Sequence, residues 1–285
     1  NSNHHTTRKI AISTGVVSTI AGSGGSPGSA EGTGTSARFR FPKGIATDGT
    51  NLYVVDQHNH KIRKIVISTG VVSTFAGSGS PGSADGTGPA ATFKYPMGIT
   101  TDGTNLYVTG NSNNIIRKIV ISSGVVTTIA GLAGSSGSTD GTGPAARFDA
   151  PYGITTDGTN LYVADTNNST IRKIVISTGV VSTFAGYAGS RASTDGTGTA
   201  ARFNKAREIS TDGTYLYVSD TGNSKIRKIV ISTGVVTTFA GSGTSGYANG
   251  AATTAEFNAP VGTVMDGTNL YVGDGNNKRI RKISF

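Results

Sequence analysis

The chain has 285 residues, of which 42 are glycine and only 14% are charged, and its formal net charge is +9. It contains no cysteine, which excludes disulfides, thiolate nucleophiles and cysteine-bound zinc. No apolar run approaches the roughly 20 residues that a membrane-spanning helix needs. We expect no signal peptide in the numbered chain, because its first residues are polar, and the Ser/Thr/Gly/Asn-rich composition favours an extracellular or periplasmic location.

The glycines recur at fixed places between short apolar runs, which indicates the turns of a repeated unit. The string Thr-Asp-Gly-Thr-(Asn/Tyr)-Leu-Tyr-Val begins at residues 47, 101, 156 and 211, and a fifth copy has Met265 in place of its first threonine. Arg-Lys-Ile begins at residues 8, 63, 117, 172, 227 and 281. Both strings advance by 54 or 55 residues, a length close to one four-stranded propeller blade with a long connection.

The predicted elements begin with two strands, at 8–13 and 16–21, that correspond to the third and fourth strands of the later units. The first complete unit, 44–98, contains an Asp-Gly hairpin turn at residue 48 and a polar loop at 56–60. Its four strands are rich in β-branched and aromatic residues and are expected at 45–47, 52–55, 61–67 and 71–76. A loop of about 20 residues then leads into the next unit.

Units begin near residues 44, 98, 153, 208 and 262, and the last one supplies only three strands before the chain ends. The sequence therefore predicts one all-β domain, 1–285, with an N-terminal part-blade at 1–22. Its 21 predicted strands fit five four-stranded antiparallel blades better than six, which is the alternative. We expect the N-terminal strands to complete the last blade and close the ring. Arg-Lys-Ile is present twice for that one blade position, and the sequence leaves open which copy occupies it.

The repeated pattern is clearest from Asp140 to Ile174. It contains Asp-Gly-Thr-Gly, Ala-Arg-Phe, Pro-X-Gly-Ile, Asn-Leu-Tyr-Val-Ala-Asp and Ile-Arg-Lys-Ile in that order. This pattern resembles the bacterial type of the NHL repeat, and the resemblance covers essentially the whole chain. It implies a β-propeller. It leaves the function open, because propellers of this kind serve as interaction modules, RNA binders, sensor domains and, in a few relatives, enzymes.

One position differs in every unit, two residues before the isoleucine of the first strand or its equivalent. We expect these residues to surround one mouth of the propeller channel, on the same side as the variable loops that follow each second strand. Loops on a rigid scaffold usually carry function, so this side is the predicted binding face. Its candidate binding residues are Lys43, Met97, Tyr152, Arg207 and Val261, together with His58, His60 and Lys205.

The fourth unit departs most from the others, because Lys205-Ala206-Arg207-Glu208 replaces the Pro-X-Gly pattern. The replacement removes a proline and a glycine and introduces three charged residues. These residues form either a corner that binds an anion or a carboxylate, or an ion pair that covers a rearranged loop. Tyr152 and Arg207 are the pair of mouth residues that we regard as the best candidates.

Most other charged residues receive structural interpretations. The arginine of Arg-Lys-Ile is expected to pair with the aspartate that ends the second strand, although Gly110 removes that partner from Arg117. The aspartate of each Asp-Gly turn is expected to bond local backbone amides rather than calcium. His58 and His60 offer two metal ligands but nothing completes a set, so we predict no metal, no cofactor and no catalytic residue.

The sequence thus predicts a non-enzymatic binding or scaffold propeller, with a protein partner or self-assembly as its most natural use. One alternative is an anion reader for RNA or acidic polysaccharide, because the pI is near 9.8 and Phe41 and Tyr152 are aromatic residues near the mouth. The other alternative is a metal-dependent, calcium-type propeller hydrolase or lyase. No Ser/His/Asp order or phosphate-binding loop supports an enzyme.

Overall fold

Alternating apolar and polar residues in each repeat form short antiparallel strands, since alternate side chains of a strand point to opposite faces. The computed structural model describes residues 2–285, and Asn1, the first residue of the predicted part-blade, lies outside the described residues. The chain divides into two compact units, Asn1–Ile129 and Ala130–Phe285, which are described separately. Within residues 2–285 the only helical segments are three-residue 3-10 turns, and none is long enough to cross a bilayer.

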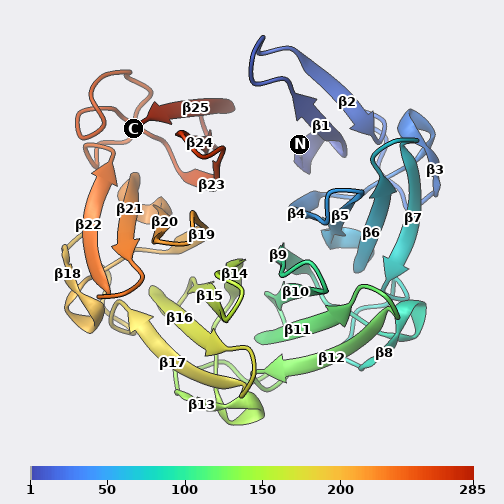
Figure 1. Ribbon diagram of the computed structural model, residues 1–285, viewed down its shortest axis with the longest axis horizontal. Coiled ribbons are helices and arrows are strands. Elements are labelled where there is room, and N and C mark those ends of the chain that lie inside the picture. The colour runs from blue at the N-terminus through green and yellow to red at the C-terminus, as the bar shows by residue number, and fades with distance from the viewer. Residues whose placement is uncertain (1) are drawn as a thin grey trace. The chain divides into compact units, whose positions relative to one another are not determined.

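The first unit contains an N-terminal pair of strands and two blades of five strands each (Figure 1). The N-terminal pair follows η1 (Ser2–His4) and consists of β1 (Thr7–Ile10) and β2 (Val17–Ala21). The first blade comprises β3 (Gly32–Thr33), η2 (Gly34–Ser36), β4 (Pro42–Thr47), β5 (Asn51–Asp56), η3 (Gln57–Asn59), β6 (Lys61–Val66) and β7 (Val71–Ala76). The second comprises β8 (Gly86–Thr87), η4 (Gly88–Ala90), β9 (Pro96–Thr101), β10 (Asn105–Gly110), β11 (Ile115–Val120) and β12 (Val125–Ala130).

The second unit contains two more blades of five strands and a C-terminal blade of three. The third blade comprises β13 (Gly141–Thr142), η5 (Gly143–Ala145), β14 (Pro151–Thr156), β15 (Asn160–Asp165), β16 (Thr170–Val175) and β17 (Val180–Ala185). The fourth comprises β18 (Gly196–Thr197), η6 (Gly198–Ala200), β19 (Ala206–Thr211), β20 (Tyr215–Asp220), η7 (Thr221–Asn223), β21 (Lys225–Val230) and β22 (Val235–Ala240). The C-terminal blade consists of β23 (Pro260–Met265), β24 (Asn269–Asp274) and β25 (Arg279–Ser284).

These antiparallel sheets confirm the predicted fold class, an all-β, five-bladed β-propeller arrangement. The four long strands of each complete blade lie where the repeat predicted them, within a few residues. The sequence did not reveal the short outer strand, in which a Gly-Thr pair from the long loop binds the edge of the fourth strand, as Gly196 does with Val236. Each complete blade therefore has five strands instead of four.

The predicted completion of the last blade by the N-terminal strands would join the two units, and it stays a prediction. Within the first unit β2 pairs with β1 in a two-stranded sheet, and within the second unit β25 pairs with β24. Each copy of the duplicated third strand thus pairs with the neighbour to which a short hairpin connects it, because closing a short loop costs little entropy.

The third-strand arginine anchors each blade. Arg227, with no exposed surface, donates from Nη1 to Asp220 at 3.0 Å and from Nη2 to Asp195 at 2.6 Å, and its guanidinium lies 5.1 Å from the centre of the Phe203 ring. Arg117, whose repeat has Gly110 in place of the aspartate, instead pairs with Asp85 at 2.9 Å. The predicted structural role of the repeated arginine is thus confirmed, and Arg117 recovers a carboxylate from the long loop.

Within each unit a loop phenylalanine fills the space between successive blades. Phe93 packs in one cluster with Tyr53 and Ile62 of the first blade and Leu106 and Ile119 of the second. The equivalent Phe203 packs between the third and fourth blades. Burial of such rings is a large part of the stabilisation of a core.

The Asp-Gly turns hold their carboxylates locally. Asp48 accepts from the backbone N–H groups of Thr50 and Asn51 at 2.9 and 2.6 Å and from the Tyr53 hydroxyl at 2.9 Å. These hydrogen bonds outweigh the opposing effect of burial and lower the pKa of Asp48 to about 2. The same contacts recur in the other copies, as with Tyr217 and Asp212. The carboxylates are therefore used within their own turns, as predicted.

Candidate functional site

The variable position of each repeat is the second residue of the blade's first strand. Its occupants are all half-buried, and they are Lys43, Met97, Tyr152, Arg207 and Val261. Lys205, just before β19, is exposed and has a positive φ of 52°. That these residues share one channel mouth stays a prediction. Within residues 130–285, where the first strands β14 and β19 lie side by side, the structure brings Tyr152 and Arg207 together.

The guanidinium of Arg207 lies over the ring of Tyr152, with 5.7 Å from Cζ to the ring centre. Among the described residues no carboxylate is in ion-pairing contact with Arg207, whereas each third-strand arginine from Arg63 onward has one. Glu208 follows Arg207 directly, yet its side chain makes no ion pair with it in the described part of the chain. The predicted ion-pair interpretation of this corner is therefore not supported by the contacts.

Gly153 provides the space in which the Glu208 side chain lies. A Cβ atom at residue 153 would lie 2.7 Å from Oε2 of Glu208 and 2.6 Å from the carbonyl oxygen of Arg207. Real side chains do not approach so closely, so glycine at this position allows the two strands and the carboxyl group to pack together. Tyr152, Gly153, Arg207 and Glu208 form the corner site.

Loss of hydration dominates the electrostatics of the corner site. Glu208 is half-buried among protein atoms, and this desolvation raises its pKa to about 8, opposed only by the backbone N–H of Ile209. Desolvation also raises the pKa of Tyr152; the neighbouring Glu208 adds to this effect and Arg207 opposes it. At neutral pH Glu208 therefore carries a proton and Arg207 keeps a positive charge without a carboxylate partner.

This arrangement suits an anion. A guanidinium presents several N–H donors in a fixed plane, which matches the two oxygens of a carboxylate. A protonated carboxyl group beside it is a further donor and adds no repulsive charge. The tyrosine ring holds the guanidinium by a cation–π contact. The corner site has the elements needed to bind a carboxylate, and it contains no nucleophile paired with a base.

In residues 2–129, His58 and His60 lie in a row of rings with His5, Phe41 and Tyr95. Successive ring centres are 4.9 Å apart for His5 and Phe41, 4.5 Å for Phe41 and His58, and 5.3 Å for His58 and Tyr95. The His60 ring contacts Tyr95 edge-on at 4.7 Å. The row is called the aromatic row below.

The two outer histidines of the aromatic row are used as backbone acceptors. Nδ1 of His60 accepts from the N–H of Tyr95 at 3.2 Å, and Nδ1 of His5 accepts from the N–H of Phe41 at 3.2 Å. Tyr95 and Phe41 have φ values of 46° and 54°, and this uncommon backbone conformation recurs at the same position of each blade. His5 and His60 thus support loop backbone, and His58 packs between the rings of Phe41 and Tyr95. Within residues 2–285 no three His, Asp or Glu side chains are grouped to hold a metal.

Positive neighbours surround His58. Its pKa is lowered first by desolvation and then by the charges of Arg40, Lys43 and His5. Desolvation, His58 and Arg40 likewise lower the pKa of His60. Both imidazoles are therefore neutral at pH 7, and the positive charge beside the aromatic row comes from Arg40 and Lys43.

Sequence reasoning missed two residues of these sites. The sequence analysis treated Glu208 only as an added charge. The other repeats have glycine at this position of the first strand, and a carboxyl group in its place is a signal of a buried acid. Tyr95 was overlooked because its hydrogen-bond partner, His60, lies 35 residues earlier. A comparison of these two positions across the repeats would have revealed the contact. Histidine at the first position occurs with an aromatic residue at the second in two cases, His5 with Phe41 and His60 with Tyr95, and the later units have neither. Met97 accepts from Gln57 at 3.2 Å, and the side chain of Val261 has no polar atom to make such a contact.

No family model matches the chain. The chain is 28% identical over 298 residues to human NHL repeat-containing protein 2, covering 90% of this chain and 41% of that protein. It is therefore distantly homologous to NHL repeat-containing proteins, and it spans about two fifths of that relative's length. Among solved structures it resembles an auxiliary nutrient binding protein from Bacteroides thetaiotaomicron, with a TM-score of 0.73 and 20% identity over 99% of this chain and 64% of that one. It also resembles virginiamycin B lyase from Staphylococcus aureus, with a TM-score of 0.58 and 17% identity over 100% of this chain and 75% of that one. These structural similarities concern the fold.

Proposed function

We propose that this protein is a non-enzymatic binding propeller that holds a partner by a carboxylate group seated on Arg207. The observation that supports the proposal is the unpaired charge of Arg207. The third-strand arginines from Arg63 onward pair with carboxylates, whereas Arg207 is held on Tyr152 beside a protonated Glu208. A half-buried cation that lacks a carboxylate partner gains from binding one.

Relatives of both kinds are consistent with the fold, since one resembling structure is called a nutrient binding protein and another a lyase. The corner site favours binding over catalysis. It offers donors and a positive charge but no activated nucleophile and no pair of acidic groups. The partner is expected to be a protein that presents an acidic side chain or a free carboxyl terminus.

Succinate is a suitable probe for this proposal, because it carries carboxylates and little else. We expect titration with succinate at constant ionic strength to shift the NMR signals of the Tyr152 ring, which contacts Arg207, in a saturable way. Arg207→Met should abolish the saturable response, and the fold tolerates methionine at this position of the second repeat, where Met97 stands. Lys205→Met is the matched control, because it removes an exposed charge just before the same strand. Equal responses in the wild type and Arg207→Met would refute the proposal.

A second candidate function, the binding of an anionic polymer, is favoured by the aromatic row. Its partly exposed rings Phe41, His58 and Tyr95 stand beside the cations Arg40 and Lys43. Rings flanked by positive charge are typical of surfaces that bind anionic chains. Binding of this kind weakens steeply with salt, so the affinity for heparin at two salt concentrations, with His58→Ala and Lys43→Met, tests it.

A further inference from the structure

The sequence contains a single Asn-Gly pair, Asn249-Gly250, in the long loop between β22 and β23. Asparagine is a chemically labile residue, because the backbone nitrogen that follows it can attack the carbonyl carbon of its side chain and expel ammonia. A following glycine favours this attack, since it has no Cβ atom to hinder the approach and allows many backbone conformations. This pair is therefore a candidate site of covalent modification.

Asn249 stands where the complete blades have an acid. The fourth blade has Asp195 at this position, whose Oδ1 accepts from Nη2 of Arg227 at 2.6 Å. In the C-terminal blade, Oδ1 of Asn249 accepts from Nη2 of Arg281 at 2.7 Å. The C-terminal blade thus has the geometry of the ion pair, with a neutral amide in place of the carboxylate. The acids that precede the short outer strand in the complete blades are Glu31, Asp85, Asp140 and Asp195.

The backbone nitrogen of Gly250 is available for the reaction. In the fourth blade the equivalent Gly196 belongs to β18 and pairs with Val236 of β22. Gly250 lies outside the strands, and within residues 130–285 its N–H donates no hydrogen bond. Asn249 and Gly250 are both exposed, and they line a cavity of about 410 Å³, which is large enough for water. The loop thus supplies a free nucleophile and access for the water that completes the reaction.

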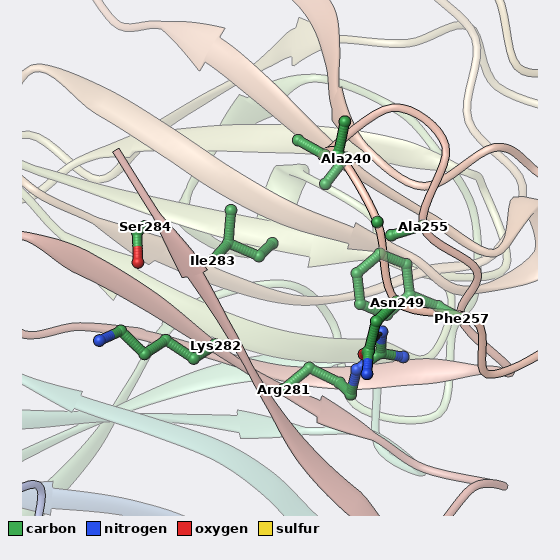
Figure 2. Close-up of a pocket in the computed structure, with 11 residues that line it drawn as sticks. Ala240, Asn249, Ala255, Phe257, Arg281, Lys282, Ile283 and Ser284 are labelled. Atoms are coloured by element: carbon green, nitrogen blue, oxygen red, sulfur yellow. Dashed lines mark hydrogen bonds between the residues drawn. The ribbon is translucent and has the colours of Figure 1, made fainter.

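Arg281 activates the amide that would react. Figure 2 shows the end of its side chain beside that of Asn249. Its guanidinium is held in place by Asp274, at 3.1 Å from Nη1, and by the carbonyl oxygen of Glu256, at 2.9 Å from the same nitrogen. A fixed donor aimed at Oδ1 stabilises the negative charge that develops on this oxygen when a nucleophile attacks Cγ. The fold therefore places an electrostatic catalyst on the side-chain carbonyl of Asn249.

We propose that Asn249 deamidates in the folded protein and that the product is the aspartate that the other blades have at this position. The nitrogen of Gly250 bonds to Cγ of Asn249, and the side-chain amide leaves as ammonia with the proton of that nitrogen, which gives a cyclic imide. Water then adds to Cγ, and the bond from Cγ to the nitrogen breaks. The backbone is restored, and the new carboxylate pairs with Arg281 as Asp195 pairs with Arg227. This inference is independent of the corner site.

Arg281 also decides which product forms. Water can open the cyclic imide at Cγ, which gives aspartate, or at the backbone carbonyl carbon, which gives isoaspartate with the chain running through the side chain. The guanidinium of Arg281 contacts the oxygen on Cγ, so it favours attack at Cγ and hence aspartate. An unfolded chain lacks this contact and should give a larger share of isoaspartate. The ratio of the two products therefore reports whether the folded site directs the reaction.

Peptide mapping by mass spectrometry tests the proposal on protein incubated at mildly alkaline pH, in native buffer and in concentrated urea. In native buffer we expect residue 249 to gain the mass difference between an amide and an acid, chiefly as aspartate. In urea the share of isoaspartate should be larger. Gly250→Ala is the control and should lose most of the mass gain. A Cβ atom at this residue would lie 3.0 Å from Oγ1 of Thr254, an exposed side chain that can turn away, so the variant should fold.

Two results of the mapping would overturn the inference. One is a native protein that keeps Asn249 while the unfolded chain converts it, and the other is the same share of isoaspartate in both conditions. The melting temperature provides a second measurement. Asn249→Asp should melt above the fresh wild type, and the incubated wild type should approach it, whereas incubation should leave Gly250→Ala unchanged. Equal melting temperatures for Asn249→Asp and the fresh wild type would contradict the proposed pairing with Arg281.

Discussion

Glu208 makes the stability of the fold depend on pH in an unusual direction. Burial raises its pKa from 4.5 to about 8, while the unfolded chain keeps a value near 4.5. Between these values the folded protein therefore binds more protons at this site than the unfolded protein. The free energy of unfolding has this contribution fully present below pH 4.5 and loses it as pH rises through 8. Glu208→Gln, which cannot ionise, should remove the effect.

The shift corresponds to roughly 5 kcal/mol if it is converted at about 1.4 kcal/mol per pKa unit. Glu208 is only half-buried, so solvent screening reduces this value, and we expect about 2 to 4 kcal/mol. The neighbouring Tyr152 should stay neutral below pH 8, because its pKa is raised above its ordinary value. The wild type should thus lose stability between pH 5 and pH 8.5, by far more than Glu208→Gln.

Urea denaturation at a series of pH values measures this difference, because the midpoint and slope give the free energy of unfolding. The control is Lys205→Met, an exposed charge beside the same strand, which should keep the wild-type pH dependence. Parallel curves for the wild type and Glu208→Gln across this range would refute the reasoning, because they would show that Glu208 ionises equally in both states.

Three further predictions concern the framework and the aromatic row. Arg227→Met removes the ion-pair partner of the buried Asp220 and should lower the free energy of unfolding, measured by urea denaturation, by about 3 to 5 kcal/mol. Arg281→Met should lower it by less, because the side chain of Arg281 is 11% exposed. Equal losses for the two variants would contradict this expectation. Tyr53→Phe removes a hydroxyl that donates to the aspartate of its turn and should lower the melting temperature by an amount equivalent to about 1 kcal/mol, so an unchanged melting temperature would contradict it. The pKa of His60 is lowered in the folded protein, so the unfolded chain binds more protons at this residue, and the wild type should lose stability as pH falls below 6.5. His60→Asn introduces the residue found at the equivalent position of the second repeat and should lose less stability over the same range. An equal loss of stability in the two proteins would count against this assignment.

The repeat made most of the fold predictable. Because each unit carries the same turn aspartate, the same arginine and the same phenylalanine, one parsed unit located the strands of all the others. The local carboxylate bonds of Asp48 and the arginine–aspartate pairs also followed from spacing. The outer Gly-Thr strand did not, because two residues carry no hydrophobic period.

The sites were less predictable, because they depend on contacts between repeats. Tyr152 and Arg207 were paired correctly from their equivalent positions in adjacent blades. The packing of Glu208 against Gly153 could not be derived, since it depends on the exact separation of two first strands. Closure of the ring by the N-terminal strands stays a prediction, because strand counting does not decide between two identical third strands.

A crystal structure of the protein grown with succinate would show directly whether the corner site binds a carboxylate. We predict a carboxylate bound to the guanidinium of Arg207, with Tyr152 still beneath it and Glu208 alongside. A guanidinium paired with Glu208, with no succinate bound at the corner site, would contradict the proposed function.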